Sequence, residues 1–220
     1  MKQLLLDIKP SAPATLQNFV IGRNAEAMAS LHALISTAYC NVLSANFFNT
    51  ASNNAISQSN FMYLWGETGS GKSHLLSACQ SIGLAVADDI HLLDNNAQIA
   101  LFNQYNQLKE SGSILIAAGL YAPTQMGLRD DLATRLAWGL VYQLHTLNDH
   151  EKASALKQHA YERGMKLPDE VADYCLRYLR RDLPTLMATL DALDEWSLTT
   201  QKPINLSMLK KLLQLNLDID

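Results

Sequence analysis

One short segment has residues of the types and the spacing that bind phosphate groups. Residues 66–73 read Gly-Glu-Thr-Gly-Ser-Gly-Lys-Ser. In this pattern the glycines let backbone N–H groups surround phosphate oxygens, the lysine reaches the β- and γ-phosphates, and the serine hydroxyl faces Mg²⁺. We therefore expect a nucleotide to bind here with Mg²⁺. The predicted nucleotide-binding residues of the loop are Gly66, Glu67, Thr68, Gly69, Ser70, Gly71, Lys72 and Ser73.

The residues on either side of the loop supply the context that phosphate binding requires. Residues 61–65 are a short apolar run typical of a strand, and the residues after Lys72 are typical of a helix that ends near Gly83. A helix that begins at the loop directs the positive end of its dipole at a bound anion. A chance glycine-rich turn lacks this strand–loop–helix order, so the order favours nucleotide binding.

Two adjacent carboxylates follow the next apolar run. Asp88 and Asp89 come directly after residues 84–87, which predict a buried strand. At such a position the first carboxylate holds Mg²⁺ and the second positions a water molecule. Adjacent acids also occur as plain turn caps, but the phosphate loop favours the functional interpretation. We therefore predict Ser73 and Asp88 as magnesium ligands and Asp89 as a catalytic residue.

Apolar periodicity predicts an α/β arrangement for the first two thirds of the chain. Besides the helix after the loop, helices are expected over residues 25–46, 95–110 and 124–138. Strands are expected over residues 61–65, 84–87, 113–118 and 140–145, and residues 49–60 are expected to form a polar surface loop. Strands that alternate with helices indicate a parallel sheet with helices on both faces.

After Asn148 the pattern becomes helical only. Asp149 is a candidate N-cap for a helix that runs to about Arg163, and Ser207 is a candidate N-cap for a last helix. Pro168 and Pro184 each suit the first turn of a helix between these two. We expect three parts, which are an extended tail over residues 1–14, an α/β domain over residues 15–147 and a helical domain over residues 148–220.

Composition limits the classes of protein to which the chain can belong. Of its 220 residues, 48% are hydrophobic and 17% are charged, which is typical of a globular protein. No apolar run approaches the roughly 18 residues that span a membrane, and the three scattered cysteines suit a cytoplasmic protein with reduced thiols. A net charge of −4 argues against a protein that follows a nucleic-acid backbone. A basic patch at Arg177, Arg180 and Arg181 remains open, although a solvated helix face is favoured there.

Taken together, the loop, the acidic pair and the helical segment resemble the DnaA/Hda branch of the AAA+ proteins, over nearly the whole chain. The resemblance is greatest to its regulatory members, which lack a DNA-binding tail. It implies an AAA+ parallel sheet with a small helical lid. Only fifteen residues separate Lys72 from Asp88, where relatives insert an extra edge strand and helix. We therefore expect a sheet that is trimmed by one edge strand.

Three further segments carry the resemblance. Residues 15–24 are similar to the segment that walls the adenine pocket, which implies nucleotide contacts by Phe19 and Gly22. Residues 132–140 are similar to box VII, which implies that Arg135 is an arginine finger that reaches a neighbour's ATP. Residues 3–8 are similar to the sliding-clamp-binding peptide of the family. The clamp-binding residues that this similarity implies are Gln3, Leu4, Leu6 and Ile8.

Two departures from the family affect hydrolysis. Leu120 stands near the position of a polar sensor residue, and Pro184 stands where the lid arginine that senses the γ-phosphate is expected. An aliphatic side chain cannot orient a water molecule or a phosphate oxygen. We therefore expect nucleotide binding with weak or absent ATPase activity of the chain's own.

The resemblance implies a negative regulator of replication initiation. It would bind adenine nucleotide and the DNA-loaded sliding clamp, and present Arg135 in trans to ATP bound by the DnaA initiator. DNA would be contacted only through the clamp, and a homo-oligomer is possible. The chain's end at Asp220 leaves no length for a DNA-binding domain. Two alternatives stay open, namely a free-standing AAA+ ATPase such as a helicase loader or adaptor, and a non-catalytic interaction module stapled by nucleotide.

Overall fold

The structure is a computed structural model that describes residues 13–47, 60–179 and 182–217. The chain divides into two compact units, an α/β unit over residues 14–146 and a helical unit that contains residues 147–217. Within the described ranges, no helix is both long and apolar enough to cross a bilayer.

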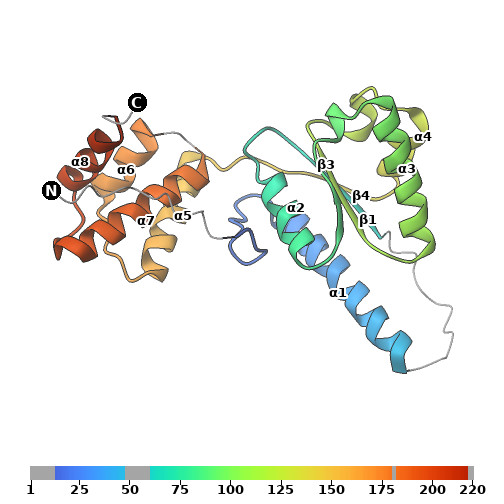
Figure 1. Ribbon diagram of the computed structural model, residues 1–220, viewed down its shortest axis with the longest axis horizontal. Helices are drawn as coiled ribbons and strands as arrows, with labels where there is room; N and C mark the ends of the chain where they lie inside the picture. Colours follow the sequence, from blue (N-terminus) through green and yellow to red (C-terminus); the bar gives the residue numbers. More distant parts are fainter. Residues whose placement is uncertain (1–12, 48–59, 180–181, 218–220) are drawn as a thin grey trace. The chain divides into compact units, whose positions relative to one another are not determined.

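The α/β unit is built on a parallel sheet, as predicted (Figure 1). Its strands are β1 (Phe61–Trp65), β2 (Ala85–Ala87), β3 (Leu115–Gly119) and β4 (Leu140–Gln143). The described part of the sheet has four strands in the order β2-β3-β1-β4. No further strand lies between the phosphate loop and β2, so β2 is left at the edge. The fifteen residues between Lys72 and Asp88 therefore hold one helix and one strand, as expected for a sheet trimmed by one edge strand.

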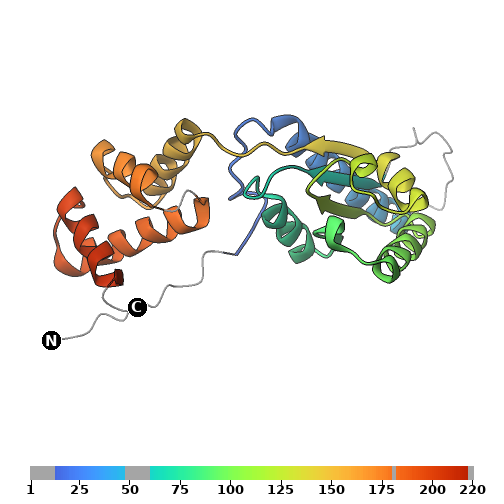
Figure 2. The ribbon, with the colours of Figure 1, turned by 90° about the horizontal axis from the view of Figure 1, so that it is seen from above.

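Helices cover both faces of this sheet (Figures 1 and 2). Side chains alternate along β1, so Met62 and Leu64 join one core and Phe61 and Tyr63 join the other. The first core is completed by α1 (Ala25–Phe47) and α2 (Lys72–Ser81), and the second by α3 (Asn95–Glu110) and α4 (Asp130–Ala137). The carboxyl ends of all the strands therefore lie at one edge, from which the phosphate loop leaves β1.

The helix predicted over residues 124–138 is wrong in its first half. The structure has a short 3₁₀ helix, η2 (Pro123–Gln125), and α4 begins only at Asp130. Gly127 adopts a φ of 62°, a left-handed conformation that interrupts a helix. Three strands are also shorter than predicted, because β2 begins at Ala85, β3 begins at Leu115 and β4 ends at Gln143, whereas β1 has the predicted bounds.

The helical unit packs four helices around an apolar core. They are α5 (Asp149–Glu162), α6 (Asp169–Tyr178), α7 (Leu183–Thr200) and α8 (Leu206–Leu217). The buried core includes Leu156, Val171, Leu190 and Leu209, which are all fully buried. Four helices in this segment agree with the expectation from the sequence.

Two of the helix caps predicted in this unit are wrong by one or two residues. Asn148, not Asp149, caps α5, because its side chain accepts a hydrogen bond from the Glu151 N–H while the Glu151 carboxylate accepts from the Asn148 N–H. Asn205, not Ser207, accepts a hydrogen bond from the Met208 N–H at the start of α8. Both errors arise because neighbouring residues are all competent caps and only geometry selects one.

Candidate nucleotide-binding site

The phosphate loop connects β1 to α2 at the carboxyl edge of the sheet. Gly69 and Gly71 have φ values of 84° and 93°, which side-chain-bearing residues rarely adopt. A Cβ atom on Gly66 would collide with the Leu144 carbonyl, and one on Gly71 would lie 2.6 Å from the ring of Phe19. Backbone conformation therefore favours glycine at residues 69 and 71, and close packing requires it at residues 66 and 71. Thr68 and Ser73 are exposed at the mouth of the loop and Glu67 is exposed beside them.

Lys72 lies folded against the loop that precedes it. Its ammonium group donates hydrogen bonds to the Gly66 and Glu67 carbonyl oxygens at 2.7 and 2.9 Å, and lies 3.5 Å from the Ser70 hydroxyl. The side chain is buried, and this desolvation lowers the pKa of Lys72, while the charges of Asp88 and Asp89 act to raise it. Both carboxylates are therefore within electrostatic range of the lysine, as a shared site requires.

The acidic pair forms a tight turn directly after β2. The Asp88 carboxylate accepts a hydrogen bond from the Asp89 N–H at 2.8 Å. Asp89 adopts φ 48° and ψ 41°, a left-handed conformation that is uncommon outside glycine and occurs at functional sites. Its side chain is 60% exposed, and its Oδ1 lies 4.0 Å from His91 Nδ1. The turn thus directs the second carboxylate to solvent.

The donor set fits a magnesium ion held together with nucleotide phosphates. Mg²⁺ is usually bound by one or two protein oxygens, by phosphate oxygens and by water. Ser73 and Asp88 supply a hydroxyl and a carboxylate of this kind. Among the described residues no group of three or more histidine, cysteine, aspartate or glutamate side chains could hold a metal by itself. A metal that required only protein ligands would not fit this edge of the sheet.

The segment before α1 packs on the phosphate loop. The Phe19 ring is buried against Gly71 and lies 5.8 Å from the His74 ring, measured between centroids. The Nε2 atom of His74 lies 3.0 Å from the Thr15 carbonyl oxygen, which ties this segment to α2. Gly22 turns the chain with a φ of 50°. Phe19 is therefore adjacent to the loop, where a wall of a base pocket is expected.

Asn24 is a site-supporting residue that the sequence reasoning missed. Its side-chain amide donates to the His145 carbonyl oxygen at 3.0 Å, and its carbonyl oxygen accepts from the His145 N–H at 2.7 Å. The side chain is only 3% exposed, so these bonds are protected from water. They connect the Phe19 segment to the end of β4, where Leu144 packs on Gly66. The only sequence signal is an asparagine directly before a helix, which suggests a cap and not a long-range bond.

Arg135 lies apart from the loop, in the last turn of α4. Leu132 and Leu136 anchor this helix in the core and leave Arg135 half-buried at its edge. The guanidinium carbon lies 4.6 Å from the centre of the Trp138 ring. Within the described ranges, no carboxylate pairs with Arg135, and no hydrogen bond joins it to residues 66–73. The structure therefore does not bring Arg135 to the chain's own loop.

Leu120 and Pro184, which the sequence analysis places at the sensor positions, lie after β3 and at the start of α7. Leu120 directly follows β3, and the Tyr63 hydroxyl donates a hydrogen bond to the next carbonyl, that of Tyr121, at 2.8 Å. Pro184 occupies the first turn of α7, where Asp182 caps the helix by accepting from the Thr185 N–H.

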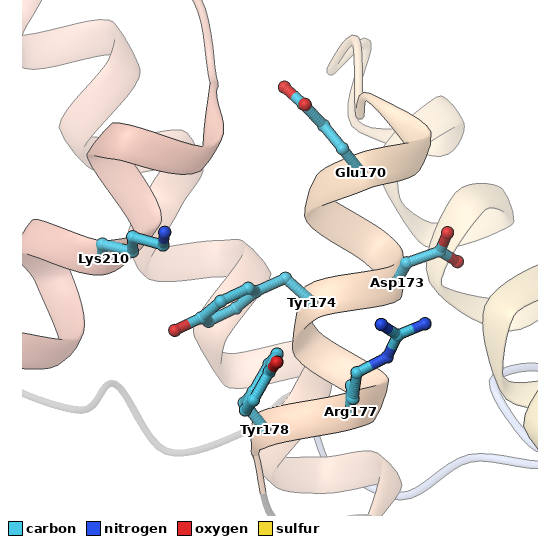
Figure 3. Close-up of a pocket in the computed structure, with 6 residues that line it drawn as sticks. All are labelled: Glu170, Asp173, Tyr174, Arg177, Tyr178 and Lys210. Atoms are coloured by element: carbon cyan, nitrogen blue, oxygen red, sulfur yellow. The ribbon is translucent and has the colours of Figure 1, made fainter.

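The surface of the helical unit carries an open depression of about 380 Å³. It lies along α6 and α8, where Tyr174 and Tyr178 face Lys210, while Arg177 and Asp173 project from another side of α6 (Figure 3). Glu170 and Asp173 balance the charges of Arg177 and Lys210, which agrees with a solvated helix face. Arg180 and Arg181 lie outside the described residues. The predicted clamp-binding residues Gln3, Leu4, Leu6 and Ile8 also lie outside them.

Comparison with known proteins gives the family context. Residues 149–213 match the family model described as the Hda lid domain. The chain is 30% identical over 248 aligned positions to a protein of Haemophilus influenzae described as uncharacterized, and the alignment covers 97% of this chain and 99% of that protein.

Solved structures show the same fold. Domain III of the Thermotoga maritima replication initiation protein DnaA superposes with a TM-score of 0.63 at 22% identity, over 93% of this chain and 98% of that one. AMPPCP-bound DnaA from Aquifex aeolicus gives a TM-score of 0.59 at 20% identity, over 82% and 65%. RuvB of Thermotoga maritima gives 0.55 at 14% identity, over 90% and 71%. The fold is thus that of AAA+ domains with a helical lid.

Proposed function

Because this chain belongs to the DnaA-related AAA+ family that includes Hda, we propose that it is a nucleotide-bound negative regulator of replication initiation. In this proposal it binds ADP or ATP and docks on the DNA-loaded sliding clamp. It then stimulates ATP hydrolysis by the DnaA initiator by supplying Arg135 in trans. Its partners are the initiator and the clamp, with DNA contacted through the clamp.

Nucleotide binding is supported by the residues gathered at the carboxyl edge of the sheet. The loop glycines leave its backbone N–H groups available to phosphate oxygens, and Lys72 can exchange its bonds to loop carbonyls for bonds to phosphates. Phe19 lies where it can pack on a base, and Ser73 and Asp88 supply oxygens for Mg²⁺. The bound ion would neutralise phosphate charge, while these residues orient the nucleotide.

The proposal that Arg135 acts on a partner's ATP is supported mainly by the surroundings of its side chain. None of the described carboxylates pairs with Arg135, and its half-buried side chain lies against an aromatic ring. A guanidinium in this state keeps its full charge for a partner's phosphates. An arginine finger stabilises the charge that develops on the transferred phosphoryl group.

Clamp binding and weak activity of the chain's own are supported by sequence alone. Residues 3–8 combine a glutamine amide, which can bond backbone groups, with leucine and isoleucine side chains that can fill an apolar cleft. Leu120 cannot orient a water molecule in the chain's own site, which favours nucleotide retention over turnover.

ATP hydrolysis by the initiator tests the proposal directly. Phosphate release would be measured with ATP-bound DnaA, clamp loaded on DNA, and this protein with ADP. We expect stimulation that Arg135→Ala reduces on the order of 10³-fold. Gln3→Ala should reduce stimulation only when the clamp is present. Arg129→Ala is a control at the N-cap of the same helix, because Arg129 is engaged by Asp131 at 2.9 Å.

The alternatives predict other results. A free-standing ATPase would hydrolyse ATP without DnaA and would lose this activity with Asp89→Ala. A non-catalytic interaction module would bind ADP as a structural ligand, which stabilises the folded state by mass action. In that case Arg135→Ala would not change the ATPase activity of any partner. Either result would contradict the proposed regulatory function and favour the corresponding alternative.

A further inference from the structure

Trp138 is a large aromatic side chain that the fold leaves exposed beside Arg135. The residue follows α4 as its C-cap, and 61% of its surface is exposed. Its ring lies 4.6 Å, at the centroid, from the guanidinium carbon of Arg135. Of the aromatic side chains, tryptophan attracts cations most strongly. The indole is therefore placed to hold the arginine instead of packing in the core.

The backbone around Trp138 is fixed on both sides. The Trp138 N–H donates to the Thr134 and Arg135 carbonyl oxygens, at 3.2 and 3.3 Å. On the other side, a Cβ atom on Gly139 would lie 2.6 Å from the Phe61 carbonyl oxygen, so the chain passes directly against the start of β1. The backbone at Trp138 is therefore held on both sides, which fixes the position from which the indole reaches Arg135.

A second aromatic residue lies near the same guanidinium. Burial raises the pKa of Tyr105, and the charge of Arg135 partly offsets this, so the phenol is within electrostatic range of the guanidinium. Tyr105 is in turn stacked on Phe61, with ring centroids 3.9 Å apart. Arg135 therefore lies on the Trp138 ring within electrostatic range of Tyr105, without a carboxylate partner in the described part of the chain.

We propose that Trp138 is a positioning residue for Arg135, which holds the guanidinium at the surface in the orientation that reaches a neighbour's ATP. This inference rests on the proposed function, because Trp138 acts only through the reaction that Arg135 completes. A free arginine side chain samples many rotamers, and an ion pair would fix it only by engaging its charge. A stacked indole restricts the rotamers and leaves the N–H groups free to donate to phosphate oxygens.

A kinetic experiment separates positioning from docking. The rate of initiator ATP hydrolysis would be titrated with wild-type protein, Trp138→Ala, Trp138→Phe and Arg135→Ala on clamp-loaded DNA. We expect Trp138→Ala to lower the maximal stimulated rate about tenfold and to leave the half-saturating concentration unchanged. Trp138→Phe should restore most of the rate, because phenylalanine also presents a ring face. An unchanged maximal rate, or a change in the half-saturating concentration alone, would overturn the proposal.

Nuclear magnetic resonance tests the contact without any partner. The Arg135 Nε–Hε signal, assigned through its loss in Arg135→Ala, should be displaced by the indole ring current and should move in Trp138→Ala. A signal that does not move would overturn the proposal even if the proposed function stands. If Arg135→Ala stimulates as well as wild type does, the proposed function fails and this inference fails with it.

Discussion

The two units of the chain bury different kinds of side chain. All the buried polar or charged residues in the described ranges belong to the α/β unit, and these are Asn24, Ser70 and Lys72. The helical unit buries only apolar residues, such as Leu186 and Leu190. Buried polar groups cost free energy unless they are bonded, and in the α/β unit they gather around the phosphate loop. The contrast indicates that the α/β unit carries the chemistry and the helical unit is optimised for packing.

The largest effect that tests this contrast is expected in the helical core. Leu190 is fully buried in α7, so Leu190→Ala should lower the free energy of unfolding of this unit by about 3 kcal/mol. Leu198→Ala is a matched control, because Leu198 lies on the same helix and is 72% exposed. Urea denaturation followed by circular dichroism measures both variants. If Leu190→Ala also abolished ADP binding at low urea, the division of roles would be wrong.

The second effect concerns ligand affinity rather than folding. Lys72→Ala removes the charged donor of the phosphate loop and should weaken ADP binding roughly a hundredfold, since charge-assisted hydrogen bonds are the strong ones. Lys109→Ala, an exposed lysine on α3, should leave the affinity unchanged. Isothermal titration calorimetry provides the comparison. Equal ADP affinities in the two variants would show that Lys72 does not contribute to nucleotide binding.

The third effect distinguishes backbone strain from packing at the site. Gly71 and Gly112 both have positive φ values, of 93° and 70°, but only a Cβ on Gly71 meets another residue, Phe19. Gly112→Ala should cost about 1 kcal/mol of stability through strain alone. Gly71→Ala should cost more and should weaken ADP binding as well. Thermal denaturation measures the stability of both variants, and calorimetry measures their affinity for ADP. Equal losses of stability and affinity in the two variants would contradict the expected role of packing at Gly71.

The smallest effect is a dependence of stability on alkaline pH. Burial raises the pKa of Cys79, in α2, and of Cys175, in α6, to about 11. A thiol with a raised pKa favours the folded state below its ordinary pKa near 9, and this contribution is lost as the pH rises toward 11. Burial also raises the pKa of Tyr63, so the α/β unit should lose more stability than the helical unit. Tryptophan fluorescence during urea unfolding of Trp196→Phe follows the α/β unit, and equal losses in both units would contradict this expectation.

Local patterns predict the parts of the molecule that depend on neighbouring residues. The phosphate loop, the strand before it and the helix over residues 95–110 are where the sequence places them, because glycine spacing and apolar periodicity are local properties. The boundaries near Gly127 and Asn148 were missed, since several adjacent residues could serve equally as breaks or caps. The Asn24–His145 bonds depend on how the chain folds, because they join residues far apart in the sequence, and no sequence pattern encodes them.

The order of strands has a further consequence for behaviour at high concentration. With β2 at one border of the sheet, its backbone N–H and C=O groups on the outer side have no strand partner in the described chain. Open borders of this kind invite pairing with another polypeptide and hence aggregation. Here the border is only Ala85–Ala87, and the turn at Asp88 and Asp89 follows immediately with negative charge. An edge strand this short, followed by two negative charges, is a poor site for intermolecular β-pairing. The trimmed sheet therefore does not make the protein prone to aggregate.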